Sequence, residues 1–438
     1  MEYIKNLENK IKEYMVKSKG ELQIKGWYYG ANKNTSIKIG LKNNQLGGAY
    51  SCPRAEESIR GKIYIIWNDD RRSIAILQSN TARNFDKMVE LWRRASYVEI
   101  EGADIYAAQK YPQVKLFDEE VNHLIYSDQD YLFELLDEYK NEFGSNGIND
   151  VNGSVSASSF QQYICNSKGL RICNRSTSFS TFILGDDIYG RSFISRKKIC
   201  KPKKQQIIQD SITRINQLKT RIKISGGEME VLLLPQVMES FIQHYLLNNL
   251  NGSNVVNKRS IFSLDNFNQE VEAIRKDMSL CINTITDYNQ GSYISTFEGV
   301  PGGEAFLIKN GKLKTPILDL KHGKKANRKA TPVPAGKGSI QFYSNDMVTL
   351  QEAIEQMDKG IIVCDLLGMH TQDPTSGNYS LTSPNSIYVE NGRVIGGCKA
   401  VISGNIFKDL RSQHTKLGKI NFEEIPFALI KSKVTGEK

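Results

Sequence analysis

The feature of this sequence that most limits its fold is a polar, glycine-rich stretch containing a β-hairpin signal. Residues 368–405 are dense in Gly, Ser, Thr and Asn, and they include the run from Val389 to Val394 with Asn391-Gly392 at its centre. Asn-Gly suits a type I′ turn, because both central residues of that turn need a positive φ. Small polar residues beside strands are unusual in an enzyme core. We therefore expect an exposed backbone surface against which another chain docks.

A second Asn-Gly hairpin is predicted upstream. It runs from Phe306 to Leu313 around Asn310-Gly311, and the glycine-rich segment 297–303 precedes it. Strand and turn patterns dominate from residue 260 onward, so the second half of the chain is expected to be β-rich. By themselves, the two signals indicate ordinary hairpins of a β-rich domain.

The first half of the chain alternates helix and strand patterns. Apolar residues at helical spacing predict helices over residues 2–19, 81–97 and 128–143, the last with a capping-box-like start at Ser127 and Asp130. Alternation predicts strands at 21–24, 35–39, 62–67 and 74–77. A chain of 438 residues is long for one core. We expect an α+β protein with an N-terminal α/β domain (1–215) and a β-rich C-terminal domain (216–438).

Composition narrows the cellular setting. No apolar run reaches the length that spans a bilayer, and the first fifteen residues are charged and amphipathic, unlike a signal peptide. The seven cysteines are scattered, odd in number and without a Cys-x-x-Cys pair. Free thiols in a reducing compartment fit this usage best, so we expect a cytoplasmic protein that does not enter a membrane.

The net charge of +10 is concentrated in two basic runs, residues 196–204 and 321–329. Such runs can neutralise phosphates, although most are solvated loops. Neither run is interleaved with the aromatic residues that single-stranded nucleic acids stack on. We therefore expect solvated loops and regard nucleic-acid binding as unlikely. If the second run lined a binding surface, it would favour acidic peptides.

Several short motifs occur in a fixed order along the second half of the sequence. They are Glu298 to Pro301, Leu307 to Leu313, Ser376 to Ser380, Glu390 to Gly392 and Ile402 to Asn405. In order and spacing they resemble the TldD/PmbA family, also called modulators of DNA gyrase. The resemblance implies a two-domain fold whose catalytic members are zinc peptidases.

The zinc signature of those catalytic members is incomplete here. Their His-Glu-x-x-x-His motif lies on the helix that corresponds to residues 235–245, which contains a single histidine, His244. Glu239 is five residues from it, so on an α-helix the two would lie about 140° apart. No cysteine follows Cys398, whereas the family's zinc site includes a late cysteine. The resemblance is therefore to the TldE/PmbA-like, non-catalytic branch, with no cofactor in this chain and zinc in its partner.

The resemblance implies a supporting subunit that pairs with a TldD-type zinc peptidase to bind and process unfolded peptides or leader peptides. The alternative is a stand-alone homodimeric peptide-binding protein of the same fold. An enzyme with a new site at His370, Asp373 and Ser376 is less favoured. No catalytic or metal residues are assigned. The candidate peptide-binding residues lie in two glycine-containing segments: Gly299, Pro301, Gly302, His370, Asp373, Ser376, Gly377 and Asn378.

Overall fold

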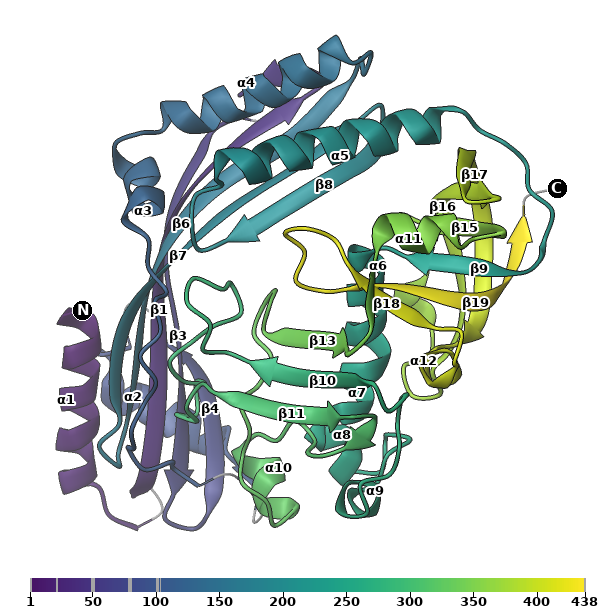
Figure 1. Ribbon diagram of the computed structural model, residues 1–438. Helices are drawn as coiled ribbons and strands as arrows, with labels where there is room; N and C mark the ends of the chain where they lie inside the picture. Colours follow the sequence, from purple (N-terminus) through teal and green to yellow (C-terminus); the bar gives the residue numbers. More distant parts are fainter. Residues whose placement is uncertain are drawn as a thin grey trace.

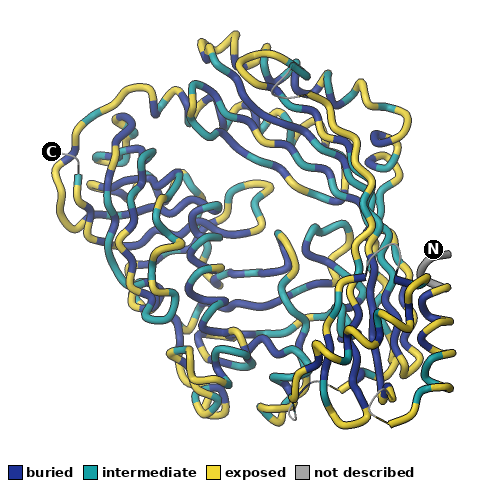
Figure 2. Tube along the Cα trace, turned by 180° about the vertical axis from the view of Figure 1, so that it is seen from behind, coloured by how far each residue is buried: buried dark blue, intermediate teal, exposed yellow. Residues whose placement is uncertain are grey.

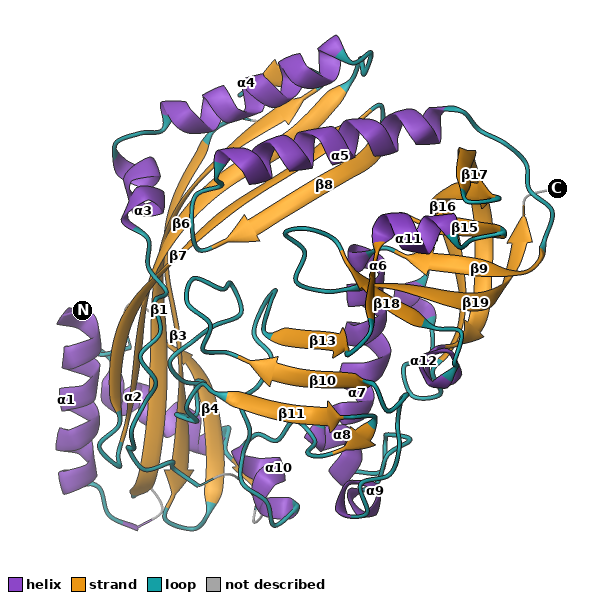
Figure 3. Cartoon of the chain, in the orientation of Figure 1, coloured by secondary structure: helices purple, strands orange, loops and turns teal. Residues whose placement is uncertain are grey.

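The structure is a computed structural model that describes residues 2–20, 23–48, 52–77, 81–99, 102 and 104–436. A long, curved sheet with helices forms the N-terminal half, and a barrel beside a smaller sheet forms the C-terminal half (Figure 1). Strands and helices are thus mixed in both halves (Figure 3), and the α+β fold class predicted from the sequence is confirmed.

The N-terminal sheet is antiparallel throughout and has the order β5-β4-β3-β1-β6-β7-β8, with β2 paired to β1. The strands expected at 21–24 and 35–39 belong to one long strand that begins at Ile24, while Glu21 and Leu22 lie outside the described residues. The strands are β1 (Ile24–Lys42), β2 (Gln45–Leu46), β3 (Arg54–Trp67), β4 (Arg71–Leu77), β5 (Tyr97–Val98), β6 (Val151–Asn166), β7 (Arg171–Gly185) and β8 (Ile188–Ser195).

Each end of this sheet buries its own helices. At one end, α1 (Glu2–Lys17) and α2 (Phe85–Arg94) pack on the aromatic side chains Trp27, Tyr29 and Trp67. At the other end, α3 (Glu119–Tyr126), α4 (Asp130–Ser145) and α5 (Lys201–Lys219) share a core with β1, β6, β7 and β8. Side chains alternate across a strand, so the opposite face of that second end carries none of these helices.

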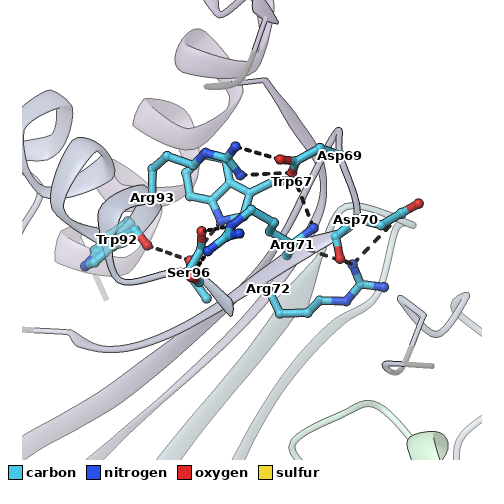
Figure 4. Close-up of polar contacts among 9 residues, drawn as sticks. Trp67, Asp69, Asp70, Arg71, Arg72, Trp92, Arg93 and Ser96 are labelled. Carbon is cyan, nitrogen blue, oxygen red and sulfur yellow. Dashed lines mark hydrogen bonds and ion pairs between the residues drawn. The ribbon is translucent and has the colours of Figure 1, made fainter. Parts of the chain in front are cut away.

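The turn between β3 and β4 is fixed to α2 by polar contacts (Figure 4). Arg93 donates to both carboxylate oxygens of Asp69, at 2.9 and 2.6 Å, and Trp67 donates to Ser73 at 2.8 Å. Ser73 in turn donates to the main-chain oxygen of Trp92. These bonds join the hairpin to the helix that covers it, and the hairpin itself agrees with the predicted pairing of 62–67 with 74–77.

The C-terminal half contains a closed barrel. Strand β9 pairs with both β15 and β19, so the series β9-β15-β16-β17-β19 returns to its start. Its strands, with the attached β14 and β18, are β9 (Gly227–Leu233), β14 (Met347–Thr349), β15 (Lys359–Val363), β16 (Asn378–Glu390), β17 (Arg393–Asn405), β18 (Lys416–Lys419) and β19 (Phe427–Gly436).

A four-stranded sheet, β12-β11-β10-β13, lies beside the barrel. Helical segments between the two join one large apolar core, which Figure 2 shows as buried residues. The strands are β10 (Met278–Asn283), β11 (Glu304–Lys309), β12 (Lys312–Leu313) and β13 (Ile340–Ser344). The helical segments are α6 (Pro235–Phe241), η2 (Ile242–Leu246), α7 (Leu247–Leu250), α8 (Gly252–Val256), α9 (Leu264–Asn268), α10 (Leu320–Lys325), α11 (Leu350–Glu355), η3 (Met369–Thr371) and α12 (Ile406–Arg411).

Both predicted Asn-Gly hairpins are present. Asn310 and Gly311 have φ values of 50° and 78°, and Asn391 and Gly392 have 49° and 70°, as a type I′ turn requires. The predicted cap of the 128–143 helix is wrong, because α4 begins at Asp130 after Gln129 and that cap makes no side-chain hydrogen bond. In the described part of the chain, no helix is long and apolar enough to cross a membrane.

Helix α5 bridges the two halves. Its residues Ile207, Ile208, Ile212 and Ile215 pack on the N-terminal sheet, whereas Leu218 packs with the barrel residues Leu232 and Ile387. The helix thus runs from one core to the other, over the stretch where the sequence predicted the domain boundary at 215/216.

Candidate functional site at the domain junction

The helix that the sequence resemblance matches to the zinc-signature helix of the family begins at Pro235, directly after β9. Proline suits a first helical position, because its missing N–H would have no partner there. The sequence predicted a regular α-helix, but the segment Ile242–Leu246 is a π-helical turn. π-Helical turns are rare in proteins, but those that occur are often located at functional sites. The angle expected between Glu239 and His244 on an α-helix therefore does not apply.

His244 fixes a neighbouring loop. Its Nε2 lies 3.1 Å from the main-chain oxygen of Gln372, and its ring packs edge-on against Tyr245 at 4.7 Å between centroids. Tyr245 donates to the main-chain oxygen of Asn378 at 3.2 Å. The middle of the loop 368–378 and its C-terminal end are thus bonded to the helix by adjacent side chains.

Glu239 points to a different partner. Its carboxylate lies 3.7 Å from the Lys337 ammonium group, in a cavity of about 70 Å³ between the two halves of the molecule. Strand β8 and helix α5 form one wall, and α6 with two loops forms the other. The charged residues lining the cavity are Arg191, Lys203, Arg214, Glu239, Lys337, Glu423 and Glu424.

Ion pairs cross this cavity from one half of the chain to the other. The Arg191 side chain, on β8, is buried and forms ion pairs with Asp210 of α5 and with Glu423 of the C-terminal half. Burial lowers the pKa of Arg191, and the Asp210 carboxylate opposes that effect. Burial also lowers the pKa of Lys203, whose Nζ donates to the main-chain oxygen of Phe422.

A larger cavity of about 430 Å³ adjoins the first. The two share Arg191, Arg214, Pro235, Gln236 and Glu423, so both open at the N-terminal end of α6. The larger cavity is also lined by apolar residues: Leu234, Leu350, Ile354, Ile362, Ile387, Val394 and Ile420. A site with apolar walls and a few charged groups is typical of ligand pockets.

The loop 368–378 holds five of the predicted peptide-binding residues. His370 and Asp373 are exposed, and Asp373 accepts hydrogen bonds from the main-chain N–H groups of Thr375 and Ser376 at 3.0 and 3.1 Å. Those bonds lower the pKa of Asp373. Ser376 Oγ accepts from the Asn378 N–H at 3.3 Å. The loop is therefore shaped by its own side chains.

Gly377 has a packing role. It is buried with a φ of 75°, and a Cβ at this position would collide with the ring of Phe407. The sequence interpretation placed a peptide backbone close to this glycine. The space beside Gly377 is instead filled by a core side chain.

The other three predicted residues lie elsewhere. Tyr111 of the N-terminal half donates to the main-chain oxygen of Gly299 at 2.9 Å, and a Cβ on Gly299 would lie 2.6 Å from Leu170. Pro301 bridges to Ser295, and Gly302 donates to Ile294. This segment docks on the N-terminal sheet, whereas the loop 368–378 contacts η2 and α12. The structure does not bring the two segments together.

The sequence predicted solvated loops for both basic runs, and this is wrong in part: Lys197, Lys201, Lys324, Lys325 and Lys329 are exposed, but each run also makes contacts across the domain junction. The buried Arg196 guanidinium donates to the main-chain oxygens of Asn289, Gln290 and Ser292, across the domain junction. In the second run, Lys321 pairs with Glu99, and Lys324 lies 3.4 Å from Asp104. The basic runs thus bind the two halves of the chain to each other.

Glu239 and His244 do not fit a zinc site. Zinc needs three or four His, Cys or carboxylate ligands around one point, and these two side chains have separate partners. The cysteines nearest in the fold, Cys364 and Cys398, are buried in the barrel, and burial raises the pKa of each thiol to about 11. Among the described residues, no three such side chains gather at one point.

Few sequence signals predict the charged cavity. Lys203 falls in the first basic run, but Arg191, Lys337 and Glu423 carry no motif and are distant along the chain. Only the folded arrangement of β8, α5, α6 and two loops brings them together.

Comparison with known proteins agrees with this architecture. Residues 226–423 match the family model for the PmbA/TldA metallopeptidase C-terminal domain. An uncharacterized protein of Methanocaldococcus jannaschii is 22% identical over 334 residues, which cover 75% of this chain and 78% of that protein. A metalloprotease PmbA homolog of Buchnera aphidicola is 27% identical over 195 residues, or 44% of this chain and 42% of that protein.

The crystal structure of TldE from Thermococcus kodakarensis is similar over almost the entire chain. The TM-score is 0.82 at 17% sequence identity, with 98% of this chain and 100% of that chain covered. This chain therefore has the fold of the TldE structure, and its residues 226–423 match the PmbA/TldA metallopeptidase C-terminal domain.

Proposed function

We propose that this chain is the TldE-like, non-catalytic subunit of a two-subunit peptidase. It pairs with a TldD-type relative that holds the zinc ion and cleaves the peptide bond. The pair acts in the cytoplasm on unfolded peptides or on leader peptides. This chain contributes binding surface and closes the site around the substrate, and it has no metal ligands of its own.

The observation that supports the proposal is the set of contacts made by Glu239 and His244 on the helix that begins at Pro235. The Glu239 carboxylate lies 3.7 Å from the Lys337 ammonium group, and His244 lies within hydrogen-bond distance of a main-chain oxygen 128 positions along the chain. Both polar groups are thereby committed to the fold. A helix used in this way supports a structural role in the peptidase pair.

A peptide would contact the exposed residues of the loop 368–378 and the larger cavity at α6. His370 and Asp373 are exposed. The main chain at the start of β16 is already bonded within the protein, since Asn378 O accepts from Tyr245 and the Ser380 N–H donates to Gln372 Oε1. The loop would therefore hold a peptide through its exposed side chains. The segment at Gly299 to Gly302 is engaged with the N-terminal sheet and serves the domain junction.

The test is reconstitution with a zinc-bearing relative encoded in the same genome. Cleavage of an unstructured peptide should require both chains, with zinc in the relative alone. Full activity of the relative by itself overturns the proposal. Peptide binding by this chain without any association would instead indicate the stand-alone homodimeric binding protein.

Two variants test the loop within the reconstituted pair. His370→Ala and Asp373→Ala should each raise the KM for peptide and leave the zinc content unchanged. His414→Ala is the matched control, because His414 is an exposed histidine on the connection before β18. Equal KM values for all three variants would exclude the loop from the peptide site.

A further inference from the structure

One face of the N-terminal sheet is lined with serines and is not covered by a described helix. Cross-strand register places Ser36, Ser158 and Ser178 in one row, and Ser154 beside Phe182 and Ser192 in another. Their strand neighbours on the opposite face, such as Ile37, Val155 and Phe179, are in the core under α3, α4 and α5. We name this surface the serine face: residues Ser36, Ser154, Ser156, Ser158, Ser176, Ser178, Ser180 and Ser192.

A row of unlike side chains crosses the serine face from strand to strand. The register joins Arg54 to Lys38, Lys38 to Ser156, Ser156 to Ser180 and Ser180 to Ile194. With strands about 4.8 Å apart, this row is roughly 19 Å long. It begins with two cations, continues through two hydroxyls and ends at an apolar side chain.

The two cations lie opposite each other without a counter-charge. Like charges at directly paired positions destabilise a sheet, and both Lys38 and Arg54 are exposed. Within the described ranges, neither has a carboxylate at ion-pair distance, unlike Lys33, which pairs with Glu57 at 2.9 Å. Two more exposed cations, Lys42 and Arg60, lie on the same face, together with one exposed carboxylate, Glu56, which is paired with Ser36. Four cations against this one carboxylate favour an anionic ligand.

The cationic end of the row borders a cavity of about 360 Å³. Lys38, Lys42 and Arg54 line it, against a single carboxylate, Asp187. Asn152, Ser154 and Phe182 add hydrogen-bonding and apolar surface. Phe182 and Ile194 are each 37% exposed, which is high for large apolar side chains on a sheet.

We propose that the serine face binds an acidic segment of extended polypeptide. Its carboxylates pair with Lys38 and Arg54, its main chain hydrogen-bonds with the serine hydroxyls, and its apolar side chains contact Phe182 and Ile194. The proposal rests on the proposed function, since it names acidic peptides as the substrate class. From the sequence, residues 321–329 were expected to favour acidic peptides if they lined a binding surface. The proposal assigns this role to the serine face instead.

A polypeptide fits the observations better than a nucleic acid. The cations are confined to one end of the row, whereas a phosphate backbone needs positive charge along its whole track. The remaining length offers hydroxyls and apolar groups. Hydroxyls both donate and accept hydrogen bonds, which matches alternating main-chain N–H and C=O groups.

The test is fluorescence anisotropy with the full chain and labelled peptides of about ten residues, enough to cross the row at ~3.3 Å per residue. The probes alternate Val with Glu, Gln or Lys. The Glu peptide should bind most tightly, with an affinity that falls as salt increases. Equal binding of all three peptides, or tighter binding of a single-stranded oligonucleotide of similar length, would overturn the proposal.

Charge reversal identifies the surface. The double change Lys38→Glu with Arg54→Glu should weaken binding of the Glu peptide by on the order of tenfold or more. Lys87→Glu, at an exposed lysine of α2, is the control and should leave it unchanged. The single change Lys38→Glu places opposite charges across β1 and β3, so the Tm should be equal or higher while binding falls. A lower Tm would attribute the loss to unfolding and overturn the assignment.

This experiment is independent of any partner chain. If reconstitution fails but the Glu peptide binds at Lys38 and Arg54, only the two-subunit peptidase is excluded. If reconstitution succeeds and the double change leaves both peptide binding and KM unaltered, the serine face is excluded and the proposed function stands.

Discussion

The Lys337 ammonium group lies 3.7 Å from the Glu239 carboxylate, at the junction of the two halves of the chain. Lys337 comes from the loop before β13, and Glu239 comes from α6. Glu239 thus lies on the helix that resembles the metal-bearing helix of the family's catalytic members. An amine supplied by the fold thus provides the positive charge beside this carboxylate.

We expect the histidine of that helix to be structural. His244→Ala should leave the zinc content of the purified chain unchanged, because the side chain bonds to the Gln372 main-chain oxygen. Loss of one such bond costs about 1 kcal/mol, and the loop 368–378 should exchange its amide hydrogens faster. Elemental analysis and hydrogen exchange measure the two effects. One zinc ion per chain that disappears in the variant would contradict this.

Gly377 provides a test of packing. Gly377→Val should destabilise the protein by about 3 kcal/mol, since it combines strain at a φ of 75° with a collision against Phe407. Gly368→Ala is the control, with a φ of 89° but its nearest contact at 3.8 Å, so only the strain of about 1 kcal/mol remains. Denaturant unfolding measures the free energy of unfolding of both variants. Equal losses of this free energy would show that local movement relieves the collision with Phe407.

The contrast between these glycines shows where the sequence was informative. Local signals were sufficient for the Asn-Gly hairpins and for the strands at 62–67 and 74–77, because each depends on neighbouring residues. Gly377 was predicted to lie beside a bound peptide, but its environment depends on Phe407, thirty positions away. The charged cavity depends on residues from 189 to 425 and had no local signal.

The basic runs likewise show that local sequence does not determine whether a charged side chain is buried or exposed. Charge density predicted solvated lysines, yet Arg196 is buried at the domain junction. Composition cannot distinguish a cation in solvent from one whose partners arrive from a distant segment. The carbonyls that accept from Arg196 belong to residues 289–292 and 177.

Arg196 should be essential for joining the two halves. Arg196→Met removes the donor for several main-chain oxygens and should destabilise the chain by about 2–4 kcal/mol. Calorimetry should then resolve two separate unfolding transitions, one for each half. Lys197→Met is the control, because that exposed side chain contacts only the face of the Tyr288 ring among its described contacts. Equal effects of both changes would refute the role of Arg196.

Asp409 gives the protein a defined pH dependence. Burial raises the pKa of Asp409 to about 6, although Tyr379 donates a hydrogen bond to it at 2.8 Å. The folded chain therefore keeps a proton that the unfolded chain releases near pH 4. The free energy of unfolding should fall as pH rises from about 4 to 6, by up to about 3 kcal/mol, and level off above that range.

Asp409→Asn should remove this decline. The amide oxygen can still accept from Tyr379, and a neutral side chain has no charge to desolvate. Relative to the parent protein, the variant should gain stability between pH 4 and 6 and keep that gain at pH 7. Asp265→Asn, at an exposed aspartate of α9, is the control and should follow the parent curve. Urea unfolding at a series of pH values provides the comparison, and parallel curves for the parent and Asp409→Asn would show that Asp409 is ionised throughout.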